Sequence, residues 1–111
     1  MSFVPVCRLV DVPRGTALGV SIEGEPVAIV HSDSGEVFAI EDICSHGQVA
    51  LSEGEIDGCT LECWLHGSRF DLRTGTALGP PATDPVPVFA ARLAGEGEAT
   101  TVLVDISTPA G

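Results

Sequence analysis

The chain has 111 residues, 44% of them hydrophobic and 19% charged, so it is long enough for one small folded domain and no more. We therefore expect residues 1–111 to form a single domain. Sixteen acidic residues against five arginines give a formal net charge of −11, which argues against nucleic acids and anionic membranes as partners because such polyanions would be repelled.

Glycine and proline occur so often that the longest stretches without either are only eleven residues, at 36–46 and 98–108. This density of breakers disfavours long helices and favours short strands. Turns are predicted at 23–25, 33–35 and 95–97. In the last strand, Val102, Val104 and Ile106 are expected on one face. The predicted fold class is all-β, with strands at 3–10, 17–22, 26–30, 37–41, 60–63, 68–71, 88–93 and 100–106.

Two short cysteine–histidine motifs stand out near the middle of the chain. The first clip is Cys44-Ser45-His46 and the second clip is Cys63-Trp64-Leu65-His66, with sixteen residues between His46 and Cys63. Two thiolates and two imidazoles delivered from two loops form a donor set that favours an iron–sulfur cluster or zinc. Zinc motifs usually pair cysteine with cysteine and histidine with histidine, whereas each clip here mixes the two types. The iron–sulfur interpretation is therefore favoured, and a structural zinc site stays open.

This double motif resembles that of the Rieske family, in which one iron is held by two cysteines and the other by two histidines. The run from Cys63 to Asp71, Cys-x-x-His-Gly-Ser-x-Phe-Asp, is also similar to the family's second loop. The resemblance implies one Rieske-type [2Fe–2S] cluster, with Cys44 and Cys63 as thiolate ligands and His46 and His66 as imidazole ligands. It covers nearly the whole chain.

The resemblance further implies a Rieske-like antiparallel β-sandwich with a small cluster-binding subdomain made of two loops, within residues 43–82. Gly47 and Gly67 directly follow the two clips and permit the close approach that wrapping a cluster requires. Ser68 matches a serine that donates to a bridging sulfide. Pro81 belongs to a segment that resembles the family's proline loop. Ordinary turn glycines and a plain linker remain the alternatives for Gly47, Gly67 and Pro81.

Three positions predict the subtype. High-potential Rieske proteins carry an extra cysteine in each loop, and the matching positions here are Val49 and Leu65, which cannot form that disulfide. Phe70 stands where many such members have a tyrosine whose hydroxyl donates toward the cluster. Fewer donated hydrogen bonds stabilise the reduced state less. We expect a potential in the low half of the Rieske range, which begins near about −150 mV.

The histidine count argues for a carrier and against a catalyst. Rieske oxygenases add a mononuclear iron held by two histidines and a carboxylate. This chain has three histidines in total, so only His31 remains beyond the two clips, and it is expected as a partly exposed residue at a strand end. No catalytic residues are assigned, and the chain is predicted to be an electron-transfer protein and not an enzyme.

The two cysteines outside the clips, Cys7 and Cys59, do not match the disulfide positions of the family. Cys59 is expected to be buried as a small apolar residue on the strand face that carries Cys63. The first fifteen residues lack the basic and apolar segments of a signal peptide, and no stretch is long and apolar enough to span a membrane. A reducing cytoplasm is therefore the expected compartment.

The acidic residues near the clips suggest a docking surface. The predicted acidic collar consists of Glu41, Asp42, Glu53, Glu55, Asp57 and Glu62. Such a collar would steer a basic face of a redox partner, and an ordinary solvated surface is the alternative.

The predicted function is one-electron transfer from an NAD(P)H-dependent reductase to an oxygenase or other acceptor. Two alternatives stay open: a Rieske ferredoxin serving iron–sulfur cluster assembly, and a zinc-stabilised interaction module without redox activity.

Overall fold

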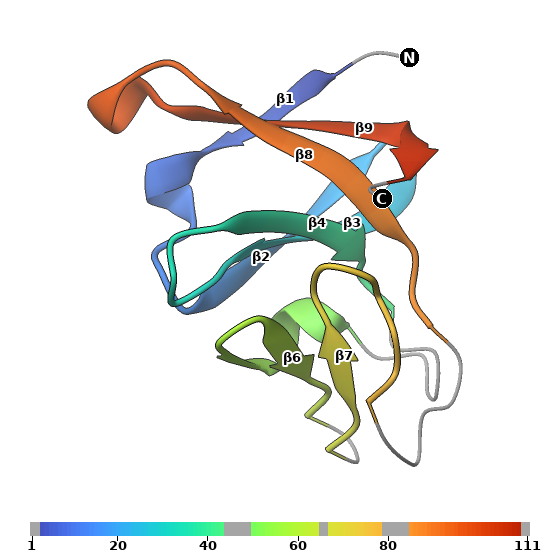
Figure 1. Cartoon of the computed structure of the whole chain (residues 1–111). Coiled ribbons are helices and arrows are strands. Elements are labelled where there is room, and N and C mark those ends of the chain that lie inside the picture. The colour runs from blue at the N-terminus through green and yellow to red at the C-terminus, as the bar shows by residue number, and fades with distance from the viewer. Residues whose placement is uncertain (1–2, 44–49, 65–66, 79–84, 110–111) are drawn as a thin grey trace.

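The computed structural model describes residues 3–43, 50–64, 67–78 and 85–109, and side chains up to residue 106. These residues form a six-stranded antiparallel sheet and a three-stranded antiparallel sheet (Figure 1). The elements in chain order are β1 (Val4–Arg8), η1 (Leu9–Asp11), β2 (Thr16–Ile22), β3 (Glu25–His31), β4 (Val37–Glu41), η2 (Leu51–Glu53), β5 (Glu55–Asp57), β6 (Thr60–Glu62), β7 (Arg69–Asp71), β8 (Val88–Ala94), η3 (Gly97–Ala99) and β9 (Thr101–Pro109).

The six-stranded sheet has the order β1-β9-β8-β4-β3-β2 and is joined weakly at its middle. Strands β4 and β8 pair through only two residue pairs, Ala39 with Phe89 and Ile40 with Val88. The two halves of the sheet therefore diverge and enclose a first core, which contains Val27, Ile29, Ala39, Val102 and Val104 among its buried residues. The prediction that Val102, Val104 and Ile106 share one face is confirmed, since Val102 and Val104 are fully buried in the first core and the partly buried Ile106 packs against it.

Strand β3 explains how one sheet serves two cores. Its four residues from Val27 to Val30 are all fully buried, because alternate side chains point to opposite faces and both faces are covered. Val27 and Ile29 enter the first core, whereas Ala28 and Val30 enter a second core against the small sheet. The second core receives Leu61 and Phe70 from the small sheet, so the two sheets stack as layers.

The small sheet has the order β5-β6-β7, and in Figure 1 it lies below β3 and β4. Its register pairs Ile56 with Leu61 and Leu61 with Phe70, so the apolar residues share the face that packs on the large sheet. The predicted all-β sandwich is confirmed. No helix in the described part of the chain is long and apolar enough to cross a lipid bilayer.

Some element boundaries differ from the predictions. The first strand was expected over 3–10, but it ends at Arg8 because Leu9–Asp11 forms a 3-10 turn. That turn is closed by the Arg8 N–H, which donates to the Asp11 carboxylate at 3.0 Å. Strand β5 and the turn η2 were not predicted at all. The expected turn at 95–97 extends into η3.

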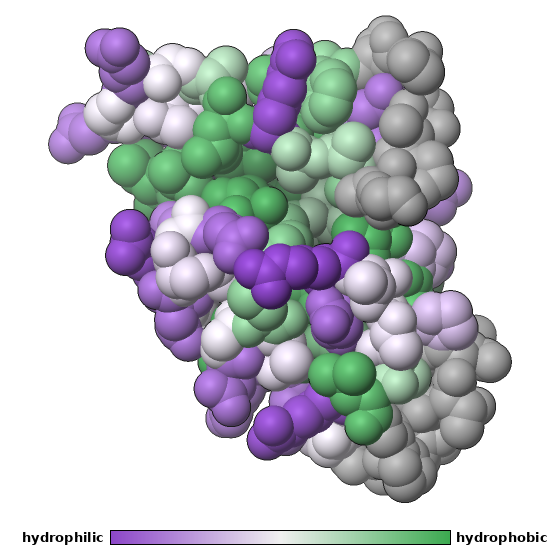
Figure 2. All heavy atoms as spheres, in the orientation of Figure 1, coloured by the Kyte–Doolittle hydropathy of each residue, from purple (hydrophilic) through white to green (hydrophobic). Residues whose placement is uncertain are grey.

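A shallow groove of about 280 Å³ opens where β4 and β8 diverge. Val37, Phe38, Phe89 and Ala91 contribute its apolar lining. Figure 2 shows hydrophobic residues gathered there on the face toward the viewer, with hydrophilic residues below them. At the edge of the groove, Arg73 pairs with Glu36 at 2.6 Å and links the segment after β7 to the connection between β3 and β4.

Candidate metal centre

The second clip begins where β6 ends. Cys63 directly follows β6 and is only 2% exposed, and Ser68 directly precedes β7 and is only 1% exposed. The Cys63 N–H donates to the Ser68 carbonyl at 2.6 Å, and the Gly67 N–H donates to the Cys63 carbonyl at 3.0 Å. These bonds close the hairpin between β6 and β7, so Cys63, Gly67 and Ser68 lie together in one turn.

Gly67 is required by the backbone and not by a shortage of space. Its φ is 75°, in the left-handed region that other residues rarely adopt. A Cβ atom built on it would meet no atom within 4 Å. A side chain at this position would therefore strain the turn that holds Cys63 and Ser68 without causing a clash.

The other predicted site residues lie outside the described part of the chain. These are Cys44, His46, Gly47, His66 and Pro81, together with Val49 and Leu65 of the disulfide comparison. Within the residues that the structure describes, no group of three or more His, Cys, Asp or Glu side chains is arranged to hold a metal ion. The assignment of four ligands therefore remains a prediction.

The surroundings of Cys63 fit an iron–sulfur ligand. Its side chain belongs to the second core, among Leu61, Phe70 and Leu51. A metal ligand must be a thiolate, and an uncompensated negative charge in such apolar surroundings is costly. A bound cation removes that cost, and a soft sulfur donor suits iron–sulfur or zinc chemistry.

Comparison with known proteins decides the family. The Rieske [2Fe–2S] domain family matches residues 2–90 of the chain. The biphenyl dioxygenase ferredoxin subunit of Pseudomonas sp. strain KKS102 is 43% identical over 111 residues, which cover 99% of this chain and 97% of the relative. The chain belongs to the Rieske family.

Solved structures agree with this Rieske assignment. The ferredoxin of carbazole 1,9a-dioxygenase from Nocardioides aromaticivorans IC177 aligns with a TM-score of 0.83 and 30% identity, over 94% of this chain and 97% of that one. A chain in the complex of reduced oxygenase and oxidised ferredoxin in carbazole 1,9a-dioxygenase aligns with a TM-score of 0.78 and 35% identity, over 92% and 91%. This Rieske protein is thus an electron carrier with one [2Fe–2S] cluster and not an enzyme, and the zinc alternative loses its support.

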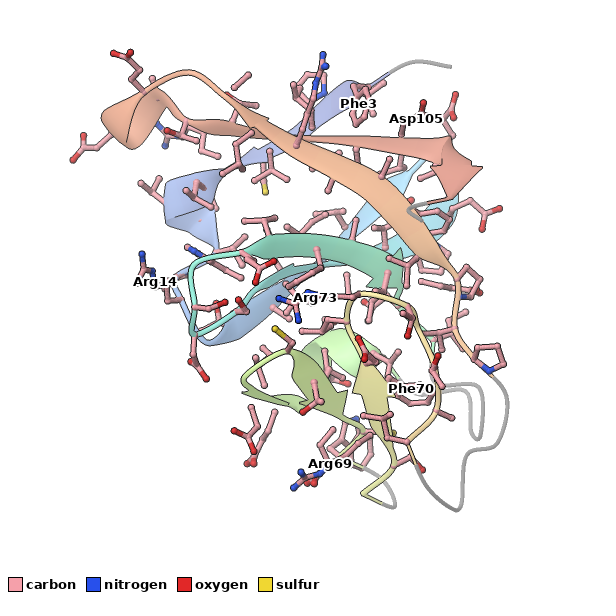
Figure 3. The ribbon with its side chains drawn as sticks, in the orientation of Figure 1. Phe3, Arg14, Arg69, Phe70, Arg73 and Asp105 are labelled. Carbon is pink, nitrogen blue, oxygen red and sulfur yellow. The ribbon has the colours of Figure 1, made fainter. Side chains whose placement is uncertain are left out.

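Phe70 of this Rieske domain lies fully buried on β7. It pairs with Leu61 on one side and forms a bridge with Ala77 on the other. Figure 3 shows Phe70 and its neighbour Arg69 on the small sheet. The position of the family's tyrosine is therefore occupied by a core residue without a hydroxyl group.

The predicted acidic collar differs from the surface that the structure shows. Asp42 is 9% exposed and accepts hydrogen bonds from Ser52, so including it in the collar was wrong. Arg69 lies 3.2 Å from Glu62 and 4.0 Å from Asp57, measured between charged atoms. The sequence did not indicate that this cation would sit among the collar acids, because the pairing depends on the register of β6 and β7.

His31 is more buried than expected. It ends β3 as predicted, but it is only 8% exposed, and its Nδ1 lies 2.7 Å from the Val12 carbonyl, to which it donates. The Gly15 N–H donates to the His31 carbonyl at 2.7 Å. The segment between β1 and β2 therefore covers the ring and makes His31 a structural residue.

The two remaining cysteines differ from each other. Cys59 lies in the turn between β5 and β6, half-buried, so the prediction that it shares a strand face with Cys63 was wrong. The turn exists because Gly58 adopts a positive φ of 61° and lets β5 pair with β6. Cys7 is half-buried on β1, and its burial, together with the nearby Asp11 carboxylate, raises the pKa of its thiol.

Proposed function

We propose that this Rieske protein is the ferredoxin component of a multi-component dioxygenase system, taking single electrons from an NAD(P)H-dependent reductase and delivering them to an oxygenase. The observation that carries the proposal is the end-to-end match with a biphenyl dioxygenase ferredoxin subunit, which leaves 1% of this chain and 3% of the relative unmatched. The carbazole dioxygenase ferredoxin supports it with a similar fold over similar lengths.

The proposed ligands are the thiolates of Cys44 and Cys63 and the imidazoles of His46 and His66, with residues 43–82 as the cluster-binding part. A bound [2Fe–2S] cluster supplies one-electron redox chemistry. The chain's own residues hold it and exclude water, since Cys63 and Ser68 are almost fully buried. Gly47, Gly67 and Pro81 would shape the loops, and Ser68 would donate toward a bridging sulfide.

The docking face is proposed around the second clip. Trp64 directly follows Cys63 and is 53% exposed, and Leu78, whose N–H donates to the Arg69 carbonyl at 2.8 Å, is 51% exposed. Exposed large apolar residues flanked by charges are typical of transient interfaces. The exposed Glu53 and Glu55 add negative charge nearby, which favours a partner with a basic face. A cytoplasmic location belongs to the same proposal, because clustered cysteine and histidine ligands suit a reducing compartment.

The test begins with the purified holoprotein. We expect two irons and two sulfides per chain, a red-brown colour that bleaches with dithionite, and a midpoint potential in the low Rieske range. A colourless protein with one zinc would contradict the cofactor assignment.

The second step is reconstitution with NADH, a dioxygenase-system reductase and an aromatic-ring oxygenase, with substrate turnover as the readout. Trp64→Ala should slow electron delivery more than Leu93→Ala, a matched apolar truncation on β8 where Leu93 is 44% exposed. A cluster-loaded protein that supports no turnover with any such oxygenase would refute the proposed partner while leaving the cofactor intact.

A further inference from the structure

The two ends of the first clip's segment are joined by one carboxylate. Asp42 follows β4, and Ser52 lies in η2. The Ser52 N–H donates to Asp42 Oδ1 at 2.6 Å, and the Ser52 hydroxyl donates to Asp42 Oδ2 at 2.8 Å. Both carboxylate oxygens thus bind a single residue ten positions further along the chain.

Both partners are themselves anchored to the large sheet. The Asp42 N–H donates to the Pro26 carbonyl on β3 at 3.0 Å. Ser52 is preceded by Leu51, which is fully buried in the second core against Ala28 and Val30 of β3. The clasp therefore connects two points whose positions the sheet already fixes.

Gly19 on β2 lies next to both the Asp42 and the Ser52 side chains. A Cβ atom built on Gly19 would lie 2.7 Å from Asp42 Oδ2 and 3.0 Å from Ser52 Oγ, so one or both of these side chains would have to shift. Glycine inside a strand weakens it, so its use here marks a place where another group comes close to the backbone. We call Gly19, Asp42 and Ser52 the clasp.

We propose that the clasp is a positioning device for the first cluster loop. Asp42 stands two residues before Cys44, and Ser52 stands six residues after His46. Fixing the separation of these two points removes conformations from the intervening segment, and metal ligands depend on such support for their geometry. The inference rests on the proposed ligand roles of Cys44 and His46.

A purely stabilising role accounts for less of this arrangement. Burying a carboxylate costs desolvation free energy, which offsets much of what its hydrogen bonds contribute to stability. Here the carboxylate and its partner both border the segment that carries the predicted ligands, and a glycine makes room for them.

The experiment uses holoprotein variants that leave the charge unchanged. Ser52→Ala removes the hydroxyl bond, and Gly19→Ala pushes on the carboxylate from β2. Ser21→Ala is the matched control, since Ser21 is an exposed serine on the same strand as Gly19. The readouts are the g-values of the dithionite-reduced protein and the rate at which its visible absorption is lost in a chelator. Urea midpoints report global stability.

We expect Ser52→Ala and Gly19→Ala to shift the g-values and to speed the loss of absorption about tenfold, the ratio that corresponds to one hydrogen bond to a charged group. Ser52→Thr, which keeps the hydroxyl, should behave like the parent protein, and Ser21→Ala should change nothing. Gly19→Ala tests the same geometry from the opposite strand if Ser52→Ala does not fold.

Unchanged g-values and loss rates in both clasp variants, with only lower urea midpoints, would overturn the positioning role and leave the proposed function intact. A parent protein without a Rieske spectrum would overturn both. The two failures are therefore distinguishable in one set of measurements.

Discussion

The packing between the two sheets should contribute most to the free energy of unfolding, and the substitution Leu61→Ala tests this expectation. Leu61 on β6 is fully buried, pairs with Ile56 and Phe70 within the small sheet, and belongs to the core that also contains Val30 of the large sheet. Leu61→Ala removes three carbon atoms from a site with no solvent access. Substitutions of this kind cost about 2–5 kcal/mol, because the lost burial and the remaining cavity both contribute.

That cost is a large part of the total free energy of unfolding for a chain of this size, since folded domains are stable by only about 5–15 kcal/mol. With a urea dependence of about 1.5 kcal/mol per molar, a loss of about 3 kcal/mol lowers the urea midpoint by about 2 M. Leu93→Ala is the control, because the same truncation at a side chain 44% exposed should stay within about 0.5 kcal/mol.

The assay follows urea unfolding by far-ultraviolet circular dichroism and by the fluorescence of Trp64, the single tryptophan, which lies next to the small sheet. Coincident transitions support a single cooperative unit and allow the midpoints to be compared as free energies. A Leu61→Ala midpoint as high as that of Leu93→Ala would refute the argument that the small sheet depends on this core. An early fluorescence transition in the parent protein would show that the small sheet unfolds alone.

Three further predictions concern Ser68, Arg73 and Cys7. Ser68→Ala should lower the midpoint potential through loss of a hydroxyl donor, and an unchanged voltammetric value would remove Ser68 from the site. Arg73→Ala should lower the free energy of unfolding by at most about 1 kcal/mol, because the pair with Glu36 is half-exposed and screened by solvent; a larger change in urea melts would contradict this. The raised pKa of the Cys7 thiol, from burial and then from Asp11, means that the thiolate forms at higher pH than in a free cysteine. Alkylation of Cys7, measured by mass spectrometry across pH, should therefore rise later than that of N-acetylcysteine, and an equal or earlier rise would refute the effect.

The raised pKa of the Cys7 thiol also makes the free energy of unfolding depend on pH. In the unfolded chain the Cys7 thiol loses its proton at its ordinary pKa, and in the folded protein it does so only at higher pH. The unfolded state therefore binds fewer protons between these two values, and the free energy of unfolding falls as the pH rises through that window. Below the unfolded-state pKa this group contributes no pH dependence.

Much of the fold could be predicted from local patterns, because a few residues decide each strand. Strand β4 coincides with the predicted range 37–41, and β3 extends the predicted 26–30 by one residue at each end. The hairpin between β2 and β3 turns through Glu23 and Gly24, which both adopt positive φ, as such two-residue turns require. These strands and this turn depend on residues that are adjacent in sequence, so they can be predicted from the sequence.

Strand β5 could not be predicted, because its existence depends on residues far from it in sequence. It has three residues, Glu55–Asp57, of which only Ile56 is apolar, so it shows no readable alternation. Its position depends on Gly54, where an added Cβ would collide with the carbonyl oxygen of Glu62 on β6. That close approach is a tertiary fact, and an isolated Gly-Glu-Ile-Asp segment contains no sign of it.

The site shows the same division between motif and environment. Cys63, Gly67 and Ser68 were predicted from a motif, and the structure places them in one closed turn. Asp42 was predicted as a surface acid, because an isolated carboxylate near a cluster loop is normally solvated. It is buried because Ser52 returns to it from ten residues away and supplies two donors for its two acceptors.

A motif thus identifies which residues meet a cofactor, because that chemistry is specific to side-chain type. The residues that support the motif are recognised by their tertiary contacts instead. Before the strand arrangement is known, any acid, serine or glycine in the sequence could have such a supporting role. Asp42 follows β4, Ser52 lies in η2 and Gly19 lies in β2, so their meeting depends on the register of β2 with β3 and on the burial of Leu51. For a Rieske carrier this implies that variants which shift β2 by a residue should disturb the first clip without touching any ligand, a consequence that the clip sequences alone do not suggest.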